Sequence, residues 1–174
     1  TQTILIIDDE PVQRRLLDAA IRRLGMASVQ AASGEEALSV LSSRTESVSV
    51  AILDLVMPGM DGLATLAAMR ERGIQTPVIV QTAQGGIETV VRAMRAGAFD
   101  FVVKPVSPDR LQLAIQQALR IGAASAEVRQ KNRRAGGPAR LGRGERAPAA
   151  RDDPERGRGG IDAPPWIPTR LTTA

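Results

Sequence analysis

Reactive side chains follow four short apolar runs of this sequence, each of them strand length. Asp8 and Asp9 follow residues 4–7, Asp54 follows residues 50–53, Thr82 comes soon after residues 78–80, and Lys104 follows residues 101–103. If these runs are parallel strands, their carboxyl ends meet at one edge of a sheet. That edge then carries three carboxylates, a hydroxyl and an ammonium group, a combination that suits a metal ion and a phosphoryl group.

The apolar runs alternate with segments of helical periodicity, and five such units fit into residues 3–128. This alternation predicts a parallel sheet with helices on both faces. We expect strands near residues 4–7, 28–31, 50–54, 77–81 and 101–103, and helices over residues 11–24, 34–41, 63–72, 87–96 and from about 107 onward. The predicted fold class is α/β, a doubly wound five-stranded parallel sheet with five helices, for which we take the strand order 2-1-3-4-5, one of the orders known for such sheets.

Residue types at the helix ends support these boundaries. Pro11 suits the first turn of a helix and Gly25 suits its end. Ser33, followed three residues later by Glu36, predicts a capping box at the second helix. In the first helix, the apolar spacing predicts that the following side chains face the core: Val12, Leu16, Leu17, Ala20, Ile21 and Leu24.

The predicted strand order places strands one and three beside the crevice where a doubly wound sheet binds its ligands. Asp8, Asp9 and Asp54 would then converge, and such close carboxylates repel one another unless a cation lies among them. Mg2+ prefers hard oxygen ligands of this kind. One carboxylate could then attack a phosphoryl group and form a mixed anhydride, with Lys104 and Thr82 contacting the phosphoryl oxygens.

Four motifs occupy the carboxyl ends of the predicted strands. They are Ile6-Ile7-Asp8-Asp9-Glu10, Leu53-Asp54-Leu55-Val56-Met57-Pro58-Gly59-Met60-Asp61-Gly62, Thr82-Ala83 and Phe101-Val102-Val103-Lys104-Pro105. In this combination, residues 3–122 resemble the receiver domain of two-component response regulators. The resemblance implies a flavodoxin-like fold and a function in phosphorelay signalling, in which a histidine kinase or phosphotransfer protein supplies the phosphoryl group.

The resemblance also implies a role for each site residue. Asp54 would be the phospho-acceptor, and Asp9, the Asp54 carboxylate and the backbone carbonyl of Val56 would bind Mg2+, while Asp8 would hold a metal-bound water. Lys104 would clamp the phosphoryl group. Thr82 would be the switch hydroxyl and Phe101 the switch aromatic.

Two further positions bear on the lifetime of the phosphorylated state. The resemblance places Val56 and Gln84 beside the water that hydrolyses the phosphoaspartate, and valine cannot orient that water by hydrogen bonding. We therefore expect slow self-dephosphorylation, over minutes or longer. The chain would be no enzyme in the ordinary sense, since it would catalyse only its own phosphorylation and this slow loss.

Composition restricts the possible partners and the location. The sequence contains no histidine, so the phosphoryl donor must be a separate kinase, a phosphotransfer protein or a small acyl phosphate. It contains no cysteine, and its apolar runs are too short to cross a bilayer, so we expect a cytoplasmic protein without membrane contact. The resemblance further implies pairing of two copies through the fourth helix, fifth strand and fifth helix. Charges of both signs are expected on that face, at Arg92, Arg95, Asp100, Asp109 and Arg110.

The end of the chain differs in character from the rest. We expect a helical linker over residues 123–134 and a disordered tail rich in Arg, Gly and Pro over residues 135–174. The net charge of +4 is unevenly distributed, since residues 129–174 carry a net charge of +6 and residues 1–128 a net charge of −2. The runs around Thr82 and Phe101 look like the receivers of sigma-54-dependent transcription activators. Those activators carry an ATPase and a helix-turn-helix domain after the receiver. This sequence has no phosphate-loop motif and no second apolar periodic region, so DNA contact would need an output domain that these residues do not contain.

Two other functions stay open. One is a stand-alone receiver that shuttles phosphoryl groups or switches protein binding without DNA output. The other is a hydrolase of the haloacid dehalogenase type, which also phosphorylates an aspartate. That class requires Asp-x-Asp after the first strand, whereas Asp8 and Asp9 are adjacent.

Overall fold

The computed structural model describes residues 2–44, 48–83 and 86–135. Five parallel strands form one sheet in the order β2-β1-β3-β4-β5. The strands are β1 (Thr3–Ile7), β2 (Ala27–Ala31), β3 (Val50–Asp54), β4 (Val78–Thr82) and β5 (Asp100–Val103), and the helices are α1 (Pro11–Arg23), α2 (Gly34–Arg44), α3 (Gly62–Glu71), α4 (Ile87–Arg95) and α5 (Pro108–Ala135). The predicted fold class and strand order are confirmed.

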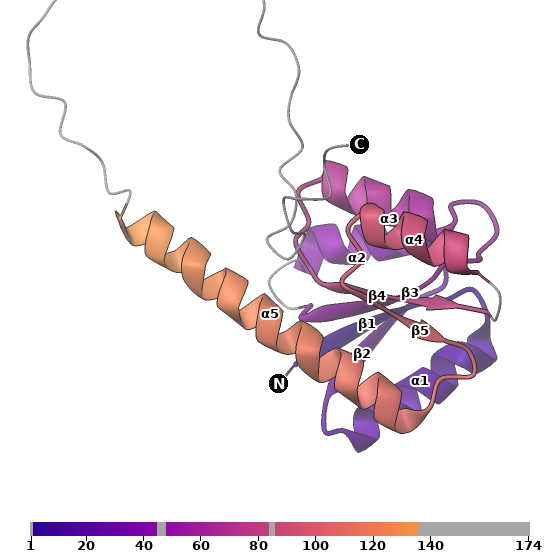
Figure 1. The fold of residues 1–174 in the computed structure, drawn as a ribbon. Coiled ribbons are helices and arrows are strands. Elements are labelled where there is room, and N and C mark those ends of the chain that lie inside the picture. The colour runs from indigo at the N-terminus through magenta and orange to yellow at the C-terminus, as the bar shows by residue number, and fades with distance from the viewer. Residues whose placement is uncertain (1, 45–47, 84–85, 136–174) are drawn as a thin grey trace, which may run out of the picture.

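Alternating side chains of the strands supply two separate cores. In β1, Leu5 and Ile7 pack with the buried residues of α2 and α3, whereas Ile4 and Ile6 pack with those of α1 and α5. Figure 1 shows α2, α3 and α4 over one face of the sheet and α1 and α5 over the other. Because both faces are covered, the neighbouring strands β1 and β3 are buried and largely apolar on both sides, and their reactive groups lie at their carboxyl ends.

The helix ends follow the predicted local chemistry. The Ser33 hydroxyl accepts a hydrogen bond from the backbone N–H of Glu36 at 3.2 Å, and the Glu36 carboxylate accepts one from the N–H of Ala32 at 2.7 Å. Gly25 follows α1 with a φ of 76°, a conformation that glycine adopts at little cost. At α3, the Asp61 carboxylate caps the helix by accepting from the Ala64 N–H at 2.8 Å.

The predicted inner face of α1 is partly wrong. Leu17 and Ile21 are buried, but Val12 and Leu16 are 63% and 61% exposed. The apolar residues of this helix span a wide arc, and only the part centred on Leu17, Ile21 and the half-buried Ala20 meets the sheet. Val12 and Leu16 lie at the margin of that arc and face solvent.

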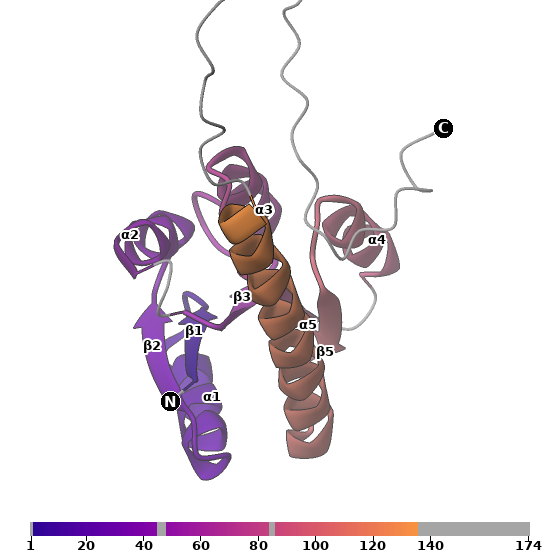
Figure 2. The same cartoon turned by 90° about the vertical axis from the view of Figure 1, so that its left-hand side faces the viewer.

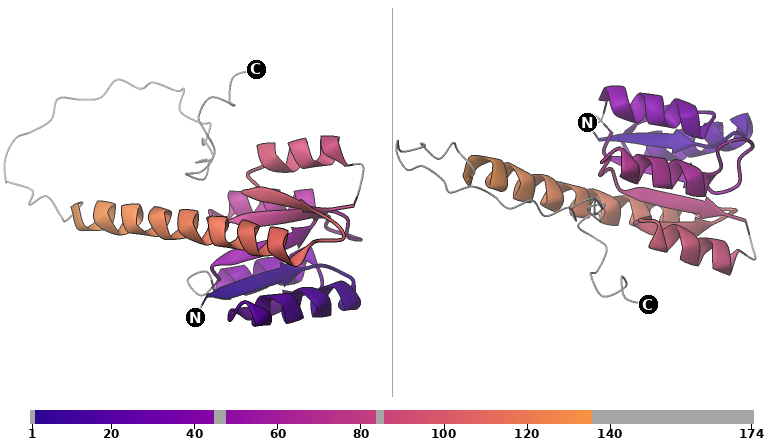
Figure 3. Two further views of the ribbon diagram at one scale, coloured as in Figure 1. Left: turned by 60° about the horizontal axis from the view of Figure 1, so that its bottom comes forward. Right: turned by 90° about the horizontal axis from the view of Figure 1, so that it is seen from above.

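Helix α5 is a single element that runs through the predicted boundary at residue 122. Its first part packs on the sheet through Leu111, Ile115 and Ala118, which are buried. Its second part projects past the edge of the sheet (Figures 1 and 3), so that in Figure 2 the orange end of α5 points toward the viewer. The predicted disordered tail, residues 135–174, lies outside the described residues except for the last residue of α5. No helix in the described part of the chain is both long and apolar enough to span a membrane.

Candidate functional site

Three carboxylates meet at the carboxyl edge of the sheet. Asp8 and Asp9 directly follow β1, and Asp54 is the last residue of the neighbouring strand β3. One carboxylate oxygen from each residue lies within 4.8 Å of the other two. The structure thus brings together residues that are more than 40 positions apart because β1 and β3 are adjacent and parallel.

Asp8 is held on both of its carboxylate oxygens. Its Oδ1 accepts a hydrogen bond from the backbone N–H of Glu10 at 2.9 Å, and its Oδ2 lies 3.1 Å from the Lys104 Nζ. The residue is only 1% exposed. Asp9 is half-buried, and no donor within the described residues is bonded to its carboxylate. Asp8 is therefore fixed by the protein, while Asp9 is available to a ligand.

Asp54 has one oxygen bound to the backbone and one to an ammonium group. The N–H of Val56 donates to Oδ1 at 3.0 Å, and the Lys104 Nζ donates to Oδ2 at 2.8 Å. Asp54 is 6% exposed, so its carboxylate is largely buried but not sealed from the surface. The last residue of β3 thereby presents a nucleophilic oxygen at the sheet edge.

Lys104 bridges the two buried carboxylates. Burial disfavours its charge, but the hydrogen bonds to Asp54 and Asp8 outweigh that effect and raise the pKa of Lys104 above the ordinary value of 10.5. The ammonium group is therefore charged at neutral pH. It occupies the place where a group bound to Asp54 would need its charge neutralised.

The donor set fits a hard divalent cation. Three carboxylates face a single ammonium group in this cluster, so the described groups leave an excess of negative charge there. Carboxylate oxygens at this spacing are the ligands that Mg2+ takes, with water completing its coordination. Asp9 and Asp54 could bind the ion directly, and Asp8, whose oxygens are already engaged, could hold one of its waters.

Thr82 lies at the end of β4 with its hydroxyl close to the start of α4. The residue is buried, and its hydroxyl donates to the Ala83 carbonyl at 3.1 Å. A Cβ atom on Gly86 would lie 2.8 Å from the Thr82 Oγ1. Gly86 therefore allows α4 to begin directly against this hydroxyl. We did not identify Gly86 from the sequence, although its place before a helical segment was a usable signal.

Gly62 has a similar role at the acceptor strand and was also not identified from the sequence. A Cβ atom there would lie 2.4 Å from the Asp54 carbonyl oxygen and 2.6 Å from the Leu55 Cα. Its N–H donates to the Leu55 carbonyl at 3.2 Å. Only glycine lets the first turn of α3 pack so closely on the backbone that carries Asp54.

The remaining predicted residues lie around this centre. Phe101 is 38% exposed on β5, and Val56 is 71% exposed just after the acceptor. The role of the Val56 carbonyl as a metal ligand stays a prediction. Gln84 lies outside the described residues.

The predicted pairing face contains one internal ion pair. The Arg110 guanidinium contacts the Asp100 carboxylate at 2.8 Å and also donates to the Phe101 carbonyl at 2.8 Å. Two of the five predicted charges thus engage each other within the chain. The other three, Arg92, Arg95 and Asp109, are exposed.

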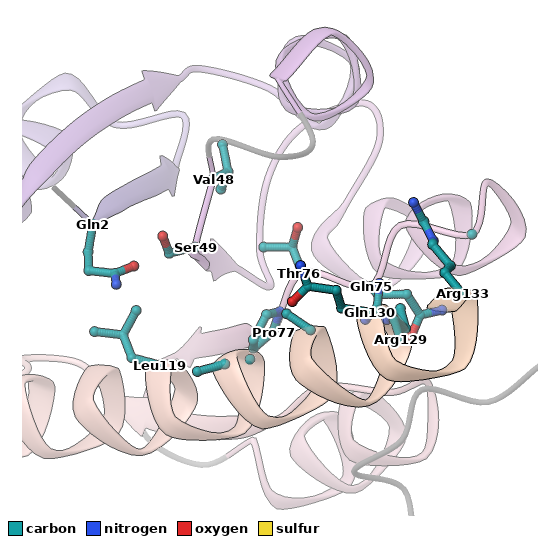
Figure 4. Close-up of a pocket in the computed structure, with 14 residues that line it drawn as sticks. Gln2, Val48, Ser49, Gln75, Thr76, Pro77, Leu119, Arg129, Gln130 and Arg133 are labelled. Atoms are coloured by element: carbon teal, nitrogen blue, oxygen red, sulfur yellow. The ribbon is translucent and has the colours of Figure 1, made fainter. Parts of the chain in front are cut away.

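A separate groove of about 590 Å3 lies away from these residues. It runs between the projecting part of α5 and the residues that precede β3 and β4, including Ser49, Thr76 and Pro77 (Figure 4). These residues mark the amino-terminal edge of the sheet, opposite the carboxylates. The groove is not part of the candidate site.

Comparison with known proteins places this geometry in a family. A family model for the response regulator receiver domain matches residues 4–116. The regulatory protein AtoC of Escherichia coli (strain K12) is 40% identical over 126 residues, which cover 72% of this chain and 27% of that protein. The response regulator protein PilR of Pseudomonas aeruginosa is 36% identical over 126 residues, which cover 72% of this chain and 28% of that protein.

Solved structures agree with this result. The receiver domain of NtrX from Brucella abortus is 34% identical and superimposes with a TM-score of 0.64, covering 67% of this chain and 98% of that one. The chain spans little more than a quarter of the length of the two curated relatives, 27% and 28%.

Proposed function

Because the chain belongs to the response regulator receiver domain family, we propose that it accepts a phosphoryl group on Asp54 in the presence of Mg2+ and switches its surface in response. The observation that carries the proposal is the contact of the Asp54 carboxylate with Lys104 at 2.8 Å, within a cluster that also holds Asp8 and Asp9. This arrangement combines a nucleophile, a cation and a metal-binding set at one sheet edge.

The chemical step requires little from the protein beyond positioning. An Asp54 carboxylate oxygen attacks phosphorus, the bond from phosphorus to the donor's imidazole nitrogen breaks, and the imidazole leaves with that electron pair. The product is an aspartyl phosphate, a mixed anhydride. Lys104 neutralises charge on the phosphoryl oxygens and the Thr82 hydroxyl donates to one of them. Mg2+, held by Asp9, Asp54 and the Val56 carbonyl, supplies further charge neutralisation when it is bound.

The donor is a sensor histidine kinase or a phosphotransfer protein. Val12 and Leu16, which are 63% and 61% exposed on α1, offer it an apolar docking surface. Helix α1 begins three residues after Asp8, so a partner bound there reaches the phospho-acceptor. These exchanges belong in the cytoplasm, where histidine kinases present their phosphoryl groups.

The output is a change of the face formed by α4, β5 and α5. A phosphoryl group adds about −2 charge and new acceptor oxygens. These oxygens draw the Thr82 hydroxyl toward Asp54. The movement of Thr82 leaves space that the Phe101 side chain can fill. Two copies then pair through this face. Because the two curated relatives are much longer than the matched region and the sequence resembles the receivers of sigma-54-dependent activators, we infer that the switch regulates transcription. The alternative is a stand-alone receiver that shuttles phosphoryl groups or switches a binding partner.

Sedimentation tests the switch. We expect beryllofluoride with Mg2+, which mimics the phosphoryl group, to shift wild-type protein toward a dimer and to leave Asp54→Asn monomeric. A wild-type protein whose sedimentation ignores beryllofluoride would contradict the proposed pairing. A dimer that forms equally in both proteins would show that association does not depend on phosphorylation.

Loss of the phosphoryl group tests the role of Val56. Its apolar side chain cannot orient the attacking water, so we expect an aspartyl phosphate that lasts for minutes or longer at neutral pH. Val56→Asn should shorten that lifetime, because the amide can hold a water by hydrogen bonding. Intact mass followed over time after removal of the donor measures both. Loss from the wild type within a few seconds would refute the expectation.

A further inference from the structure

We propose that Arg14 is a positioning residue for the metal-binding loop, which holds Asp9 in the orientation needed to bind Mg2+. The inference rests on the proposed function, since it concerns the affinity of that site for the cation. Arg14 belongs to none of the motifs considered above, and it does not contact the carboxylates.

Arg14 is tied to the backbone on both sides of Asp9. Its Nη1 donates to the Asp8 carbonyl at 2.7 Å and to the Asp9 carbonyl at 3.1 Å. Arg14 is half-buried. Its side chain rises from the first turns of α1, so it links the helix to the loop that leaves β1.

These two carbonyls belong to the two peptide planes that flank the Cα of Asp9. Each peptide unit is planar, so fixing both planes fixes the backbone dihedral angles of Asp9 and hence the direction of its Cα–Cβ bond. The preceding residue is fixed as well, through the hydrogen bond from the Glu10 N–H to the Asp8 carboxylate at 2.9 Å. Since no donor in the described part of the chain is bonded to the Asp9 carboxylate, the backbone is what sets the direction in which this side chain leaves the loop.

Electrostatics and positioning predict opposite effects when the Arg14 charge is removed. Arg14 is a cation beside a cation site, so its removal should tighten Mg2+ binding if only its charge matters. If it positions Asp9, its removal should weaken binding. Groups that orient metal ligands typically contribute about 10- to 100-fold to metal affinity. The sign of the change therefore distinguishes the two roles.

The experiment is calorimetric titration of Mg2+ into the full chain, with wild type, Arg14→Met, Arg14→Lys and Arg15→Met. Arg15 is exposed on the same helix, so Arg15→Met removes an equal charge without touching the loop. We expect Arg14→Met to raise the Kd by about tenfold or more and Arg14→Lys, which retains one donor and the charge, to raise it less. Arg15→Met should leave the Kd unchanged or slightly lower it.

Unfolding by urea, with Mg2+ absent, separates positioning from general damage. We expect the four proteins to remain folded before titration. If Arg14→Met fails to fold, the comparison of Arg14→Lys with wild type decides, with a weaker affinity expected. An Arg14→Met protein that binds Mg2+ as tightly as wild type, or more tightly, would overturn the inference while leaving the proposed function intact. A wild type that binds no Mg2+ would overturn both.

Discussion

The Asp54 carboxylate shows how a buried charge can stay reactive. Its two oxygens are bound by the Val56 N–H and by Lys104, which compensates the cost of removing a charge from water. The Lys104 Nζ also lies 3.1 Å from the Asp8 Oδ2. If Lys104 turns toward a phosphoryl group on Asp54, Asp8 still keeps its hydrogen bond from the Glu10 N–H. A single ammonium group thus stabilises the resting site and is already in place for the reaction.

A titratable group remote from this site allows a test of the residue contacts. Hydrogen bonds from Ser28 and then Arg22 lower the pKa of Asp18 below its ordinary value of 3.8, joining α1 to the first residues of β2. A carboxyl whose pKa is lowered by folding stabilises the protein above its unfolded pKa, and that contribution disappears as the pH falls through the folded pKa.

We therefore expect Asp18→Asn to be less stable than wild type at pH 7, by less than about 1 kcal/mol because the Arg22 side chain is exposed. The difference should shrink as the pH falls below 3.8. Urea unfolding at a series of pH values measures it. A difference that stays constant into the acid range would show that the lowered pKa does not contribute to stability.

At the level of elements, α3 packs closely on the end of β3, where Asp54 lies, and Gly62 makes this close approach possible. A side chain at Gly62 would meet main-chain atoms of Asp54 and Leu55 at 2.4 and 2.6 Å, and the backbone cannot yield as a flexible side chain would. We expect Gly62→Ala to lower the free energy of unfolding by roughly 1 to 3 kcal/mol, the usual cost of overpacking.

Gly122 provides the matched control for that substitution. It lies within α5, and a Cβ atom there would lie 3.5 Å from the Pro77 Cγ, an ordinary contact. Gly122→Ala should raise stability by up to about 1 kcal/mol, because alanine favours the helix. Denaturation by urea compares the two. Equal effects of both substitutions would mean that the close approach at Gly62 is tolerated.

The sequence predicted which elements form, because each element's pattern is local. Alternation of apolar runs and helical segments was sufficient to predict a parallel sheet covered by helices, and cap residues such as Ser33 located helix starts. The strand order came with the family resemblance, because local patterns do not show which strands are neighbours. The exposed positions of Val12 and Leu16 were predicted wrongly, because periodicity shows an apolar arc but not how much of it the sheet covers. The helical extension expected over residues 123–134 agrees with α5, which ends at Ala135.

The site residues that lie at the ends of strands could be predicted from the sequence. Asp8, Asp9, Asp54, Thr82 and Lys104 could be named from their positions after apolar runs. Gly62, Gly86 and Arg14 could not, since their roles depend on distances between atoms of different elements. An arginine in a helix is usually a solvated surface charge, and nothing in its spacing reveals that two backbone carbonyls accept its hydrogen bonds.

In the whole molecule, the reactive groups and the groove beside α5 lie at opposite edges of the sheet. The reactive groups gather at the carboxyl edge of the sheet, while the groove beside α5 lies at the amino-terminal edge (Figure 4). The proposed output face, α4, β5 and α5, includes the helix that projects beyond the sheet (Figure 3). Under the proposed switch, we expect a change at Thr82 to reach the helix that projects beyond the sheet.

The most direct test of this account is the location of the phosphoryl group itself. Protein incubated with acetyl phosphate and Mg2+ should gain the mass of one phosphoryl group. Treatment with hydroxylamine, which reacts with acyl phosphates, should mark only the peptide that contains Asp54. Removal of Mg2+ or the substitution Asp54→Asn should abolish the gain. A phosphoryl group on any other peptide, or an equal gain in Asp54→Asn, would contradict the assignment of Asp54 as the phospho-acceptor.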